Sequence, residues 1–462
     1  MTTTTTPEAS QALAERLAAT ITGLYGQALP DQTVAMARSL VLDVLGLCVA
    51  TRGESYIQAI LGTVEPGGNC TALGHPGAFN VYDAALINGT AAHGEDFDDT
   101  FEGGPVHSGA VVVPAVLAAC EREGLGGDAL LLGVAVGAEL MCRLALPAPR
   151  ATHKAGFHPT AVMGALAAAA GVSAALRLTA QQTASALGIA GSMASGIIEY
   201  LAEGTSTKRM HAGWAAQSGI RAALMARGGF DGPRTVLEGT HGFYKAFAPS
   251  LTPALHLLMD GFGSDWVMQT IAFKPYACGT MTQPYIDCAI QLAESGVQAD
   301  DIESIVCKVG EGTVHRLWET LAVKHRPPTP YAAKFSTPYC MAVGFFDRRA
   351  GFSQYTEARV RDETLLALAA KISYVVDPAN EYPKNFTGHL RATFKDGRVV
   401  EFDQPHMRGG ARDPLPPAEL QQKFVDNLVY GGWSEAQAQQ AGAWCDAVFT
   451  QASMQGAAQF RQ

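Results

Sequence analysis

The apolar positions of this chain recur mostly at helical spacing. Leu13, Leu17, Ile21 and Leu24 predict a helix within residues 8–25, and Asp31 is a suitable N-cap for a second helix that continues to about residue 49. Thr179-Ala-Gln-Gln182 forms a capping box that starts a helix reaching about residue 193. Other stretches rich in Ala, Val and Leu predict buried helices over residues 111–123, 127–144, 159–175 and 212–227.

The pattern changes near Trp266. Residues 304–309 alternate like a strand, and residues 390–394 and 398–402 flank Lys395-Asp396-Gly397, which predicts a hairpin. Helices are predicted over 282–295 and 336–347, and again from residue 416 onward. We therefore expect a mainly α protein with a large all-helical domain (1–262), a smaller α+β lid domain (263–404) and C-terminal helices (405–462) that return to the helical domain.

Composition narrows the possible partners. The 462 residues are 48% apolar and only 16% charged, which suggests that another subunit covers part of the surface, so we expect an obligate oligomer. The formal net charge is −10 and no block of Lys or Arg occurs, which argues against nucleic acid or an anionic membrane as a partner. An anionic substrate must then be held by a few local cations.

The cysteines and the N-terminus indicate the compartment. Nine cysteines are scattered among apolar neighbours, which predicts reduced thiols and a cytoplasmic protein. Residues 1–7 lack the basic and apolar regions of a signal peptide, and we expect a frayed tail there. Polar residues or glycines interrupt the apolar runs, so no transmembrane helix is expected. A nucleotide cofactor is not expected, because the sequence contains neither G-x-G-x-x-G nor a Walker A motif.

Candidate chemistry gathers in residues 88–109. In a helix, His93 and Asp96 are three residues apart and Asp96 and Thr100 four apart, so their side chains can share a face. A Gly/Pro loop then allows His107 to return toward that face. Apolar segments on both sides suggest that the cluster is buried, where carboxylates require partners or a function. Two alternatives stay open: a metal site, although no HExxH, CxxC or EF-hand spacing accompanies it, and a solvated acidic helix end.

Two further segments could bind an anion. His158 precedes Pro159 at the predicted start of a helix, where unpaired N–H groups and the helix dipole favour negative charge. Lys208 lies before the helix of residues 212–227 and is a candidate to bind a carboxylate. The simpler alternatives are a helix-capping histidine and a solvated Lys-Arg pair.

Five motifs, in order, resemble the MmgE/PrpD family. They are Asn88-Gly-Thr-Ala-Ala-His-x-x-Asp-Phe-Asp-Asp-Thr100, Gly156-Phe-His-Pro, Thr207-Lys208, Lys274-Pro-Tyr and Lys334-Phe-Ser-x-x-Tyr339. The family includes 2-methylcitrate dehydratase, cis-aconitate decarboxylase and iminodisuccinate epimerase. The resemblance implies a helical domain formed by both chain ends, a smaller lid domain, a homodimer, and an active site between the domains that contains no metal or cofactor.

The resemblance also implies roles for particular residues. Asp96, Thr100, His107, His158, Lys208, Lys274 and Tyr339 match the family's active-site positions. We expect His107 and His158 to transfer the proton, with Asp96 orienting a histidine or sharing its proton, because imidazole titrates near neutral pH. Lys208 and Lys274 are expected to hold substrate carboxylates, with Thr100, Tyr339 and His93 adding contacts.

Two departures from the relatives bear on the substrate. Gly279 and Gln283 stand where relatives have histidines, and the loop between Thr100 and His107 adds Glu102, so we expect a substrate other than cis-aconitate itself. The sequence thus predicts a cofactor-independent lyase of a small di- or tricarboxylate, with β-elimination as the first choice. The alternatives are an epimerase of an iminodisuccinate-like acid, a decarboxylase of a cis-aconitate-like acid, and a carboxylate-binding protein that has lost the chemistry.

Overall fold

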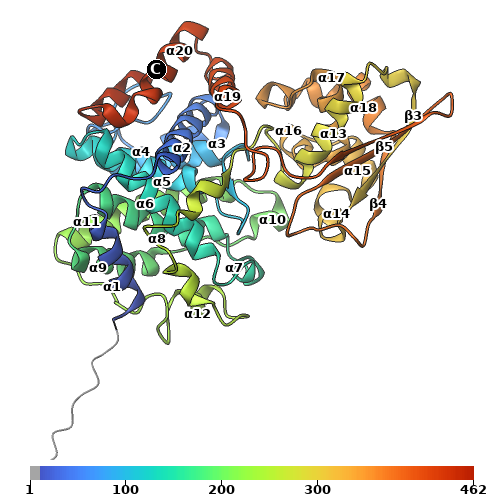
Figure 1. Cartoon of the computed structure of the whole chain (residues 1–462). Coiled ribbons are helices and arrows are strands. Elements are labelled where there is room, and N and C mark those ends of the chain that lie inside the picture. The colour runs from blue at the N-terminus through green and yellow to red at the C-terminus, as the bar shows by residue number, and fades with distance from the viewer. Residues whose placement is uncertain (1–10) are drawn as a thin grey trace, which may run out of the picture. The chain divides into compact units, whose positions relative to one another are not determined.

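The computed structural model describes residues 11–462, which form two compact units (Figure 1). Unit 1 contains the chain through Gly94, residues 100–269 and residues 440–462, and unit 2 contains residues 95–99 and 270–439. The expected tail (1–7) and the start of the expected first helix (8–10) lie outside the described residues. Most of the expected lid domain, 263–404, falls in unit 2, which also includes the helix that follows it.

Unit 1 is helical. Its main helices are α1 (Leu13–Gly23), α2 (Asp31–Ala50), α3 (Ser55–Leu61), α4 (Val81–His93), α5 (Ser108–Glu123), α6 (Gly127–Ala145), α7 (Ala151–Lys154), α8 (Pro159–Ala175), α9 (Ala180–Met193), α10 (Tyr200–Glu203), α11 (Thr207–Arg227) and α12 (Phe243–Phe247). A short strand, β1 (Thr100–Phe101), and four 3₁₀ turns, η1 (Leu255–Leu258), η2 (Val267–Thr270), η7 (Val448–Thr450) and η8 (Met454–Phe460), complete it.

The core of unit 1 is α8, all of whose residues are buried. It packs against α5, α6, α9 and α11. Small residues allow the backbones to come close: a Cβ on Gly133 of α6 would lie 2.8 Å from the carbonyl oxygen of Gly171 on α8. The Ala- and Gly-rich composition therefore has a packing reason, since larger side chains would push these helices apart.

Helix α2 is the one helix of residues 11–462 that is long and apolar enough to cross a membrane. However, 72% of its most apolar window is buried, and α2 packs against α4, α5 and α6. Its composition is that of a core helix in unit 1.

Unit 2 combines helices with a small sheet. Its helices are α13 (Gln283–Glu294), α14 (Glu311–Leu317), α15 (Leu321–His325), α16 (Pro330–Ala333), α17 (Thr337–Asp347), α18 (Glu363–Ala369) and α19 (Pro417–Tyr430), and its strands are β2 (Ile271–Ala272), β3 (Ile302–Val309), β4 (Ile372–Val376), β5 (Gly388–Phe394) and β6 (Val399–Gln404). Short 3₁₀ turns are η3 (Thr280–Thr282), η4 (Ala299–Asp301), η5 (Phe352–Gln354) and η6 (Arg359–Arg361). Helix α20 (Glu435–Asp446) runs from unit 2 into unit 1.

The sheet has the order β4-β3-β5-β6. Strands β3 and β4 are parallel, whereas β3–β5 and β5–β6 are antiparallel. Helix α13 packs on β5 and β6, and α17 packs on α13 (Figure 1). The predicted β5–β6 hairpin is confirmed, as is the mainly α fold with a smaller α+β part.

Candidate active site

Three predicted histidines lie together in unit 1. His93 ends α4, His107 is the N-cap of α5, and His158 is the N-cap of α8. The ring centroids of His93 and His107 are 4.9 Å apart, and those of His93 and His158 are 5.4 Å apart. Three segments far apart in sequence thus place their imidazoles within one small region.

A fourth histidine, His211, which the sequence motifs did not predict, lies beside these three. The Nδ1 atoms of His158 and His211 are 3.1 Å apart, and Tyr200 packs edge-on against both rings. His211 lies three residues after Lys208 on α11, so that spacing would have indicated a shared face. We call His93, His107, His158 and His211 the histidine cluster.

The surroundings of His158 and His211 favour neutral imidazoles. Burial lowers the pKa of His158 well below its usual value, and the positive charges of neighbouring His93 and Lys208 lower it further. Burial and the same two neighbours lower the pKa of His211 to about 4. Both rings are therefore uncharged at neutral pH and can accept a proton, and a bound anion would raise their pKa values.

The starts of three helices also make this region favourable for an anion. His107 and His158 are the N-caps of α5 and α8, and buried Lys208 is in the first turn of α11. The Thr160 hydroxyl accepts a 3.3 Å hydrogen bond from the His107 backbone N–H, which ties the start of α5 to that of α8. Helix N-termini and a lysine ammonium both attract carboxylates.

In unit 2, three buried lysines hold the acidic segment 95–99. Each donates a hydrogen bond to one of three successive carbonyls: Lys334 to Glu95 (3.0 Å), Lys274 to Asp96 (2.9 Å) and Lys423 to Phe97 (2.7 Å). We call this arrangement the lysine clamp. It fixes a backbone in which Asp96 has a φ of 58°, a left-handed conformation that few non-glycine residues adopt.

Asp96 and Lys274 lie together within this segment. The Lys274 ammonium is 3.9 Å from Asp96 Oδ1 and 3.8 Å from Asp98 Oδ1, and Tyr331 donates a 3.1 Å hydrogen bond to Asp96 Oδ2. Lys274 thus has protein partners in unit 2, and its contact with a substrate carboxylate stays a prediction.

The remaining residues singled out from the sequence are Thr100, Glu102 and Tyr339. Thr100 is buried in β1, directly after the acidic segment, and Glu102 follows it with a partly exposed side chain. Tyr339 is buried on α17, where its hydroxyl donates a 3.1 Å hydrogen bond to the Gln354 carbonyl. Their substrate contacts stay predictions.

Gly279 and Gln283, where the resemblance implied histidines in relatives, make hydrogen bonds to the nearby backbone. Gln283 is fully buried, and its side-chain amide donates to the carbonyls of Tyr276 (3.3 Å) and Cys278 (3.4 Å). The Gly279 N–H donates 2.9 Å to the Lys334 carbonyl, and a Cβ at Gly279 would lie 3.2 Å from the Phe335 ring.

The sequence matches both halves of one family. Residues 15–255 match the MmgE/PrpD N-terminal domain, and residues 276–446 match the MmgE/PrpD C-terminal domain. Cis-aconitate decarboxylase from Aspergillus terreus is 27% identical over 430 residues, which cover 86% of this chain and 85% of that protein. The human cis-aconitate decarboxylase is 28% identical over 438 residues (90% and 88%), and the mouse protein 28% over 444 residues (90% and 87%). This chain therefore belongs to the MmgE/PrpD family.

Proposed function

We propose that this protein is a lyase that acts on a small di- or tricarboxylate through proton transfer at a carbon beside a carboxylate. The observation that carries the proposal is the histidine cluster beside Lys208. In it His107 and His158 are the N-caps of α5 and α8, and Lys208 is in the first turn of α11. The groups whose charges lower the pKa of His158 are all basic, so an anionic ligand would be stabilised there. Relatives that match most of the chain are named as lyases of cis-aconitate, which supports the class of reaction.

In the β-elimination that we favour, a neutral imidazole removes a proton from the carbon beside a carboxylate. The C–H electron pair becomes the new C=C bond, the C–O bond of the β-hydroxyl group breaks, and an imidazolium protonates the departing oxygen to give water. Helix N-termini and Lys208 stabilise the negative charge that develops on the carboxylate. His107 and His158 are the residues that we propose for the two proton transfers.

Decarboxylation is the second candidate, because the named relatives are decarboxylases. In that reaction the C–C bond to a carboxylate breaks, CO₂ leaves with no electron pair, and an imidazolium protonates the carbon that keeps the pair. A protonated histidine of the same cluster would supply that proton, so the geometry of unit 1 suits both reactions.

Incubation with citrate, 2-methylcitrate and cis-aconitate in deuterated water, followed by NMR, tests the proposal. Elimination gives an unsaturated acid and water, whereas decarboxylation gives an acid with one carboxylate fewer. Exchange of a C–H proton with no change of carbon skeleton or loss of water would assign an epimerase instead. A ligand that raises the melting temperature without any exchange or product would overturn the proposal in favour of a carboxylate-binding protein.

We also propose that the reaction requires no added cofactor and no metal. Because imidazoles can ligate zinc, removal of metal ions tests this part of the proposal directly. Dialysis against a chelator should leave turnover unchanged, and a loss of turnover that a divalent ion restores would contradict this part of the proposal.

We further propose that two copies of the chain form a homodimer. Four large apolar side chains within residues 197–214 are exposed: Ile197 (62%), Leu201 (45%), Met210 (37%) and Trp214 (42%). Met210 and Trp214 are four residues apart on α11 and share a face. Exposed apolar groups gathered in one short stretch are typical of an interface between proteins.

A further inference from the structure

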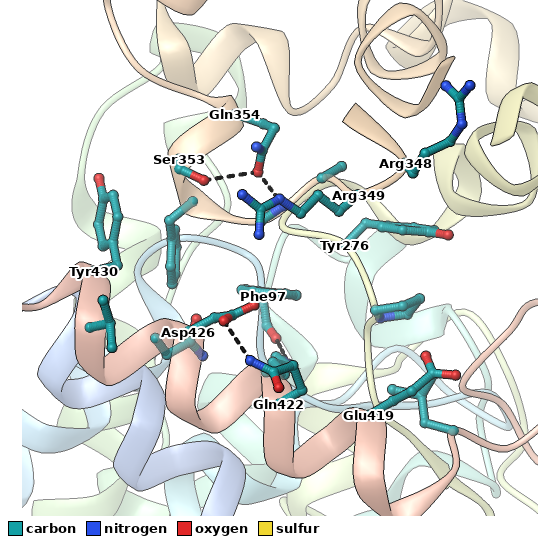
Figure 2. A pocket seen from close by; sticks show the side chains of 18 of the residues that line it. Phe97, Tyr276, Arg348, Arg349, Ser353, Gln354, Glu419, Gln422, Asp426 and Tyr430 are labelled. Carbon is teal, nitrogen blue, oxygen red and sulfur yellow. Dashed lines mark hydrogen bonds between the residues drawn. The ribbon is translucent and has the colours of Figure 1, made fainter. Parts of the chain in front are cut away.

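Unit 2 contains a pocket of about 390 Å³ that the proposed reaction does not use (Figure 2). Its wall is formed by α19, by the segment between α17 and η5, and by residues near Phe97 and Tyr276. None of the residues that the sequence predicted for the active site lines it. The volume lies within the range of pockets that hold organic ligands, about 300–1,000 Å³.

Positive charge predominates along the wall. Arg348, Arg349, Arg408 and Lys423 line the pocket, against two carboxylates, Glu419 and Asp426. Arg408 already pairs with Glu419, and Gln422 donates a 2.9 Å hydrogen bond to Asp426. The excess of cations favours an anionic ligand.

Arg349 is the cation available to such a ligand. Its side chain is exposed, and across residues 11–462 it makes no hydrogen bond or ion pair. Figure 2 shows it extending into the space between Ser353 and Gln354 on one side and Phe97 on the other. A guanidinium in this position can bind a carboxylate or phosphate through two parallel N–H groups.

Asn427 supplies a second, independent indication of a ligand. It lines the pocket from α19, it is only 3% exposed, and its side-chain Nδ2 has no hydrogen-bond partner within the described part of the chain. A buried N–H donor left unpaired destabilises the folded protein. An acceptor oxygen in the pocket would remove that destabilisation, so both Asn427 and Arg349 favour an oxyanion.

Aromatic rings form the apolar part of the wall. Phe352 stacks on Tyr430 with ring centroids 5.2 Å apart, and Phe97 packs edge-on against Phe352 at 5.3 Å. Flat apolar groups pack favourably on such rings. The pocket therefore combines donors for an oxyanion with a surface for a planar group.

We propose that this pocket binds an organic anion in which a carboxylate or phosphate is joined to a flat apolar body. The oxyanion would contact Arg349 and Asn427, and the flat body would lie against Phe352 and Phe97. The ligand would also be next to the lysine clamp, because Phe97 and Lys423 belong to both. This site goes beyond the proposed reaction and does not depend on it.

Calorimetric titration of the full chain with benzoate, phenyl phosphate, inorganic phosphate and benzyl alcohol tests the site. We expect benzoate or phenyl phosphate to bind at least tenfold more tightly than inorganic phosphate and benzyl alcohol, since each of the latter has only half of the required chemistry. Whichever of benzoate and phenyl phosphate binds more tightly shows whether the site prefers a carboxylate or a phosphate. Failure of both to bind, or equal binding of benzyl alcohol or inorganic phosphate, overturns the proposal.

Variants locate the binding. Arg349→Ala changes an exposed side chain, so the fold should persist, and we expect at least tenfold weaker binding of the preferred probe. Asn427→Leu keeps the number and branching of the side-chain heavy atoms but removes the amide, and should weaken binding likewise. Arg398→Ala changes an exposed arginine directly before β6, outside the pocket; it is the matched control and should bind like the natural protein. Unchanged affinity in Arg349→Ala would show that the probe binds elsewhere.

Discussion

The imidazole of His158 meets two requirements of a proton-transfer group at neutral pH. Burial and basic neighbours keep it uncharged in the free protein, so it can accept a proton. Its position as N-cap of α8 places it where an incoming carboxylate is stabilised by backbone N–H groups. A carboxylate that binds there would raise the pKa of the base and so prepare it for the reaction.

Replacing His158 by Gln should therefore lower turnover by a factor of about 10²–10⁴, the usual contribution of general acid–base catalysis. Glutamine retains hydrogen-bonding capacity, so the fold should remain and can be checked by circular dichroism. His241→Gln changes an exposed histidine and serves as the control. Turnover of the His158 variant within a factor of two of the natural protein would exclude His158 from the chemistry.

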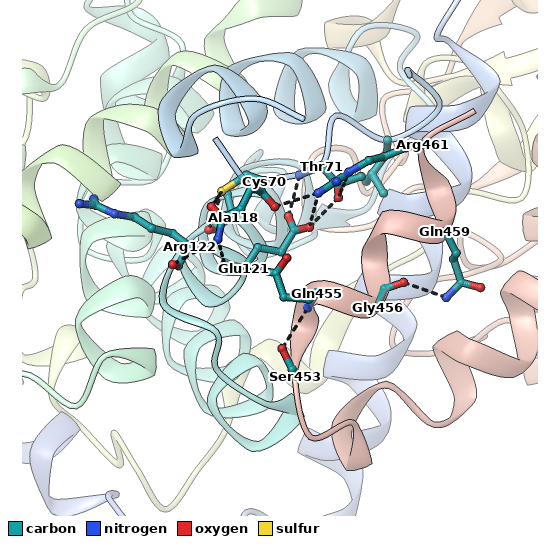
Figure 3. Close-up of polar contacts among 12 residues, drawn as sticks. Cys70, Thr71, Ala118, Glu121, Arg122, Ser453, Gln455, Gly456, Gln459 and Arg461 are labelled. Carbon is teal, nitrogen blue, oxygen red and sulfur yellow. Dashed lines mark hydrogen bonds and ion pairs between the residues drawn. The ribbon is translucent and has the colours of Figure 1, made fainter. Parts of the chain in front are cut away.

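Glu121 shows how burial acts on a carboxyl group that has a structural function (Figure 3). It is fully buried at the end of α5, where it accepts hydrogen bonds from the Thr71 hydroxyl and the Thr71 backbone N–H (2.9 Å). The guanidinium of Arg461 lies 3.7 Å away and also donates to Thr71 and to the Asn69 carbonyl. Glu121 thus helps to anchor the C-terminal residues within unit 1.

The pH dependence of stability should reveal this carboxyl group. Burial raises the pKa of Glu121 from 4.5 to about 7, although the bonds from Thr71 and the charge of Arg461 lower it. The folded protein therefore binds the proton more tightly than the unfolded chain. The resulting stabilisation is fully present below pH 4.5 and is lost as the pH rises toward 7, with a maximum of about 3 kcal/mol.

Urea unfolding of the natural protein and of Glu121→Gln at pH 5 and pH 8 measures this effect. The difference in unfolding free energy between the two should shift by about 1–3 kcal/mol in favour of the variant at pH 8. Comparison with the variant cancels the contribution of the buried histidines, whose lowered pKa values act in the opposite direction. Glu123→Gln, an exposed neighbour, is the control, and a pH-independent difference for Glu121→Gln would refute the prediction.

At the scale of elements, close helix packing sets the positions of the catalytic candidates. Helix α4 carries His93 and α11 carries Lys208 and His211, and the two helices meet at Gly89 and Gly213. A Cβ on Gly89 would lie 2.6 Å from the Gly213 Cα, and one on Gly213 would overlap the Leu86 carbonyl oxygen. Neither helix can approach so closely with a larger residue.

Gly213→Ala should therefore destabilise the protein by about 1–3 kcal/mol and lower turnover, because α11 must move away from α4. Gly23→Ala is a matched control, since Gly23 ends α1 and a Cβ there would meet nothing within 4 Å. That change should be neutral or stabilising by up to about 1 kcal/mol. Equal melting temperatures for the two variants would contradict this account of the α4–α11 contact.

The features that could be predicted from the sequence are those set by residues close together along the chain. The Thr179 hydroxyl accepts from the Gln182 N–H at 3.2 Å, as the capping box predicted, and the Asp-Gly turn joins β5 to β6. The lysine clamp could not be predicted in this way, because its hydrogen bonds join residues 178 to 326 positions apart. Strand β4 was not predicted, because its sequence, Ile-Ser-Tyr-Val-Val, does not alternate between apolar and polar residues. In the structure its last two residues, Val375 and Val376, are exposed.

In the candidate site, too, local motifs predicted some residues, whereas contacts between distant segments could not be predicted. His107 and His158 were recognised from local motifs, and the structure brings them together with His93. His211 was missed because its one local signal, the position three residues after Lys208, places it on the same helix face as Lys208 but does not show that it meets another histidine. Its contact with His158 depends on α8 and α11 packing together, which local patterns do not encode.

At the scale of the whole molecule, low charge and exposed apolar residues support the proposal of a second subunit. With 16% charged residues, the chain has limited means to keep an apolar patch in solution. Trp214 and Met210 lie on a helix that also carries Lys208 and His211 near its start. A partner subunit that covered Met210 and Trp214 would therefore contact the same helix that carries Lys208 and His211.

If the proposed homodimer forms through this face, Trp214→Glu should convert it to a monomer, because a buried unpaired carboxylate at an interface costs several kcal/mol. Light scattering coupled to size-exclusion chromatography measures the mass, which should be about twice the 48.6 kDa chain for the natural protein and equal to it for the variant. Val399→Glu changes an exposed apolar residue on β6 of unit 2 and should leave the dimer intact. A natural protein that elutes as a monomer would refute the dimer, whereas a dimer that survives Trp214→Glu would place its interface elsewhere on the chain. Turnover of the monomeric variant then decides whether the second copy matters for the chemistry, since loss of activity with an intact fold would mean that dimerisation stabilises the active arrangement of α11.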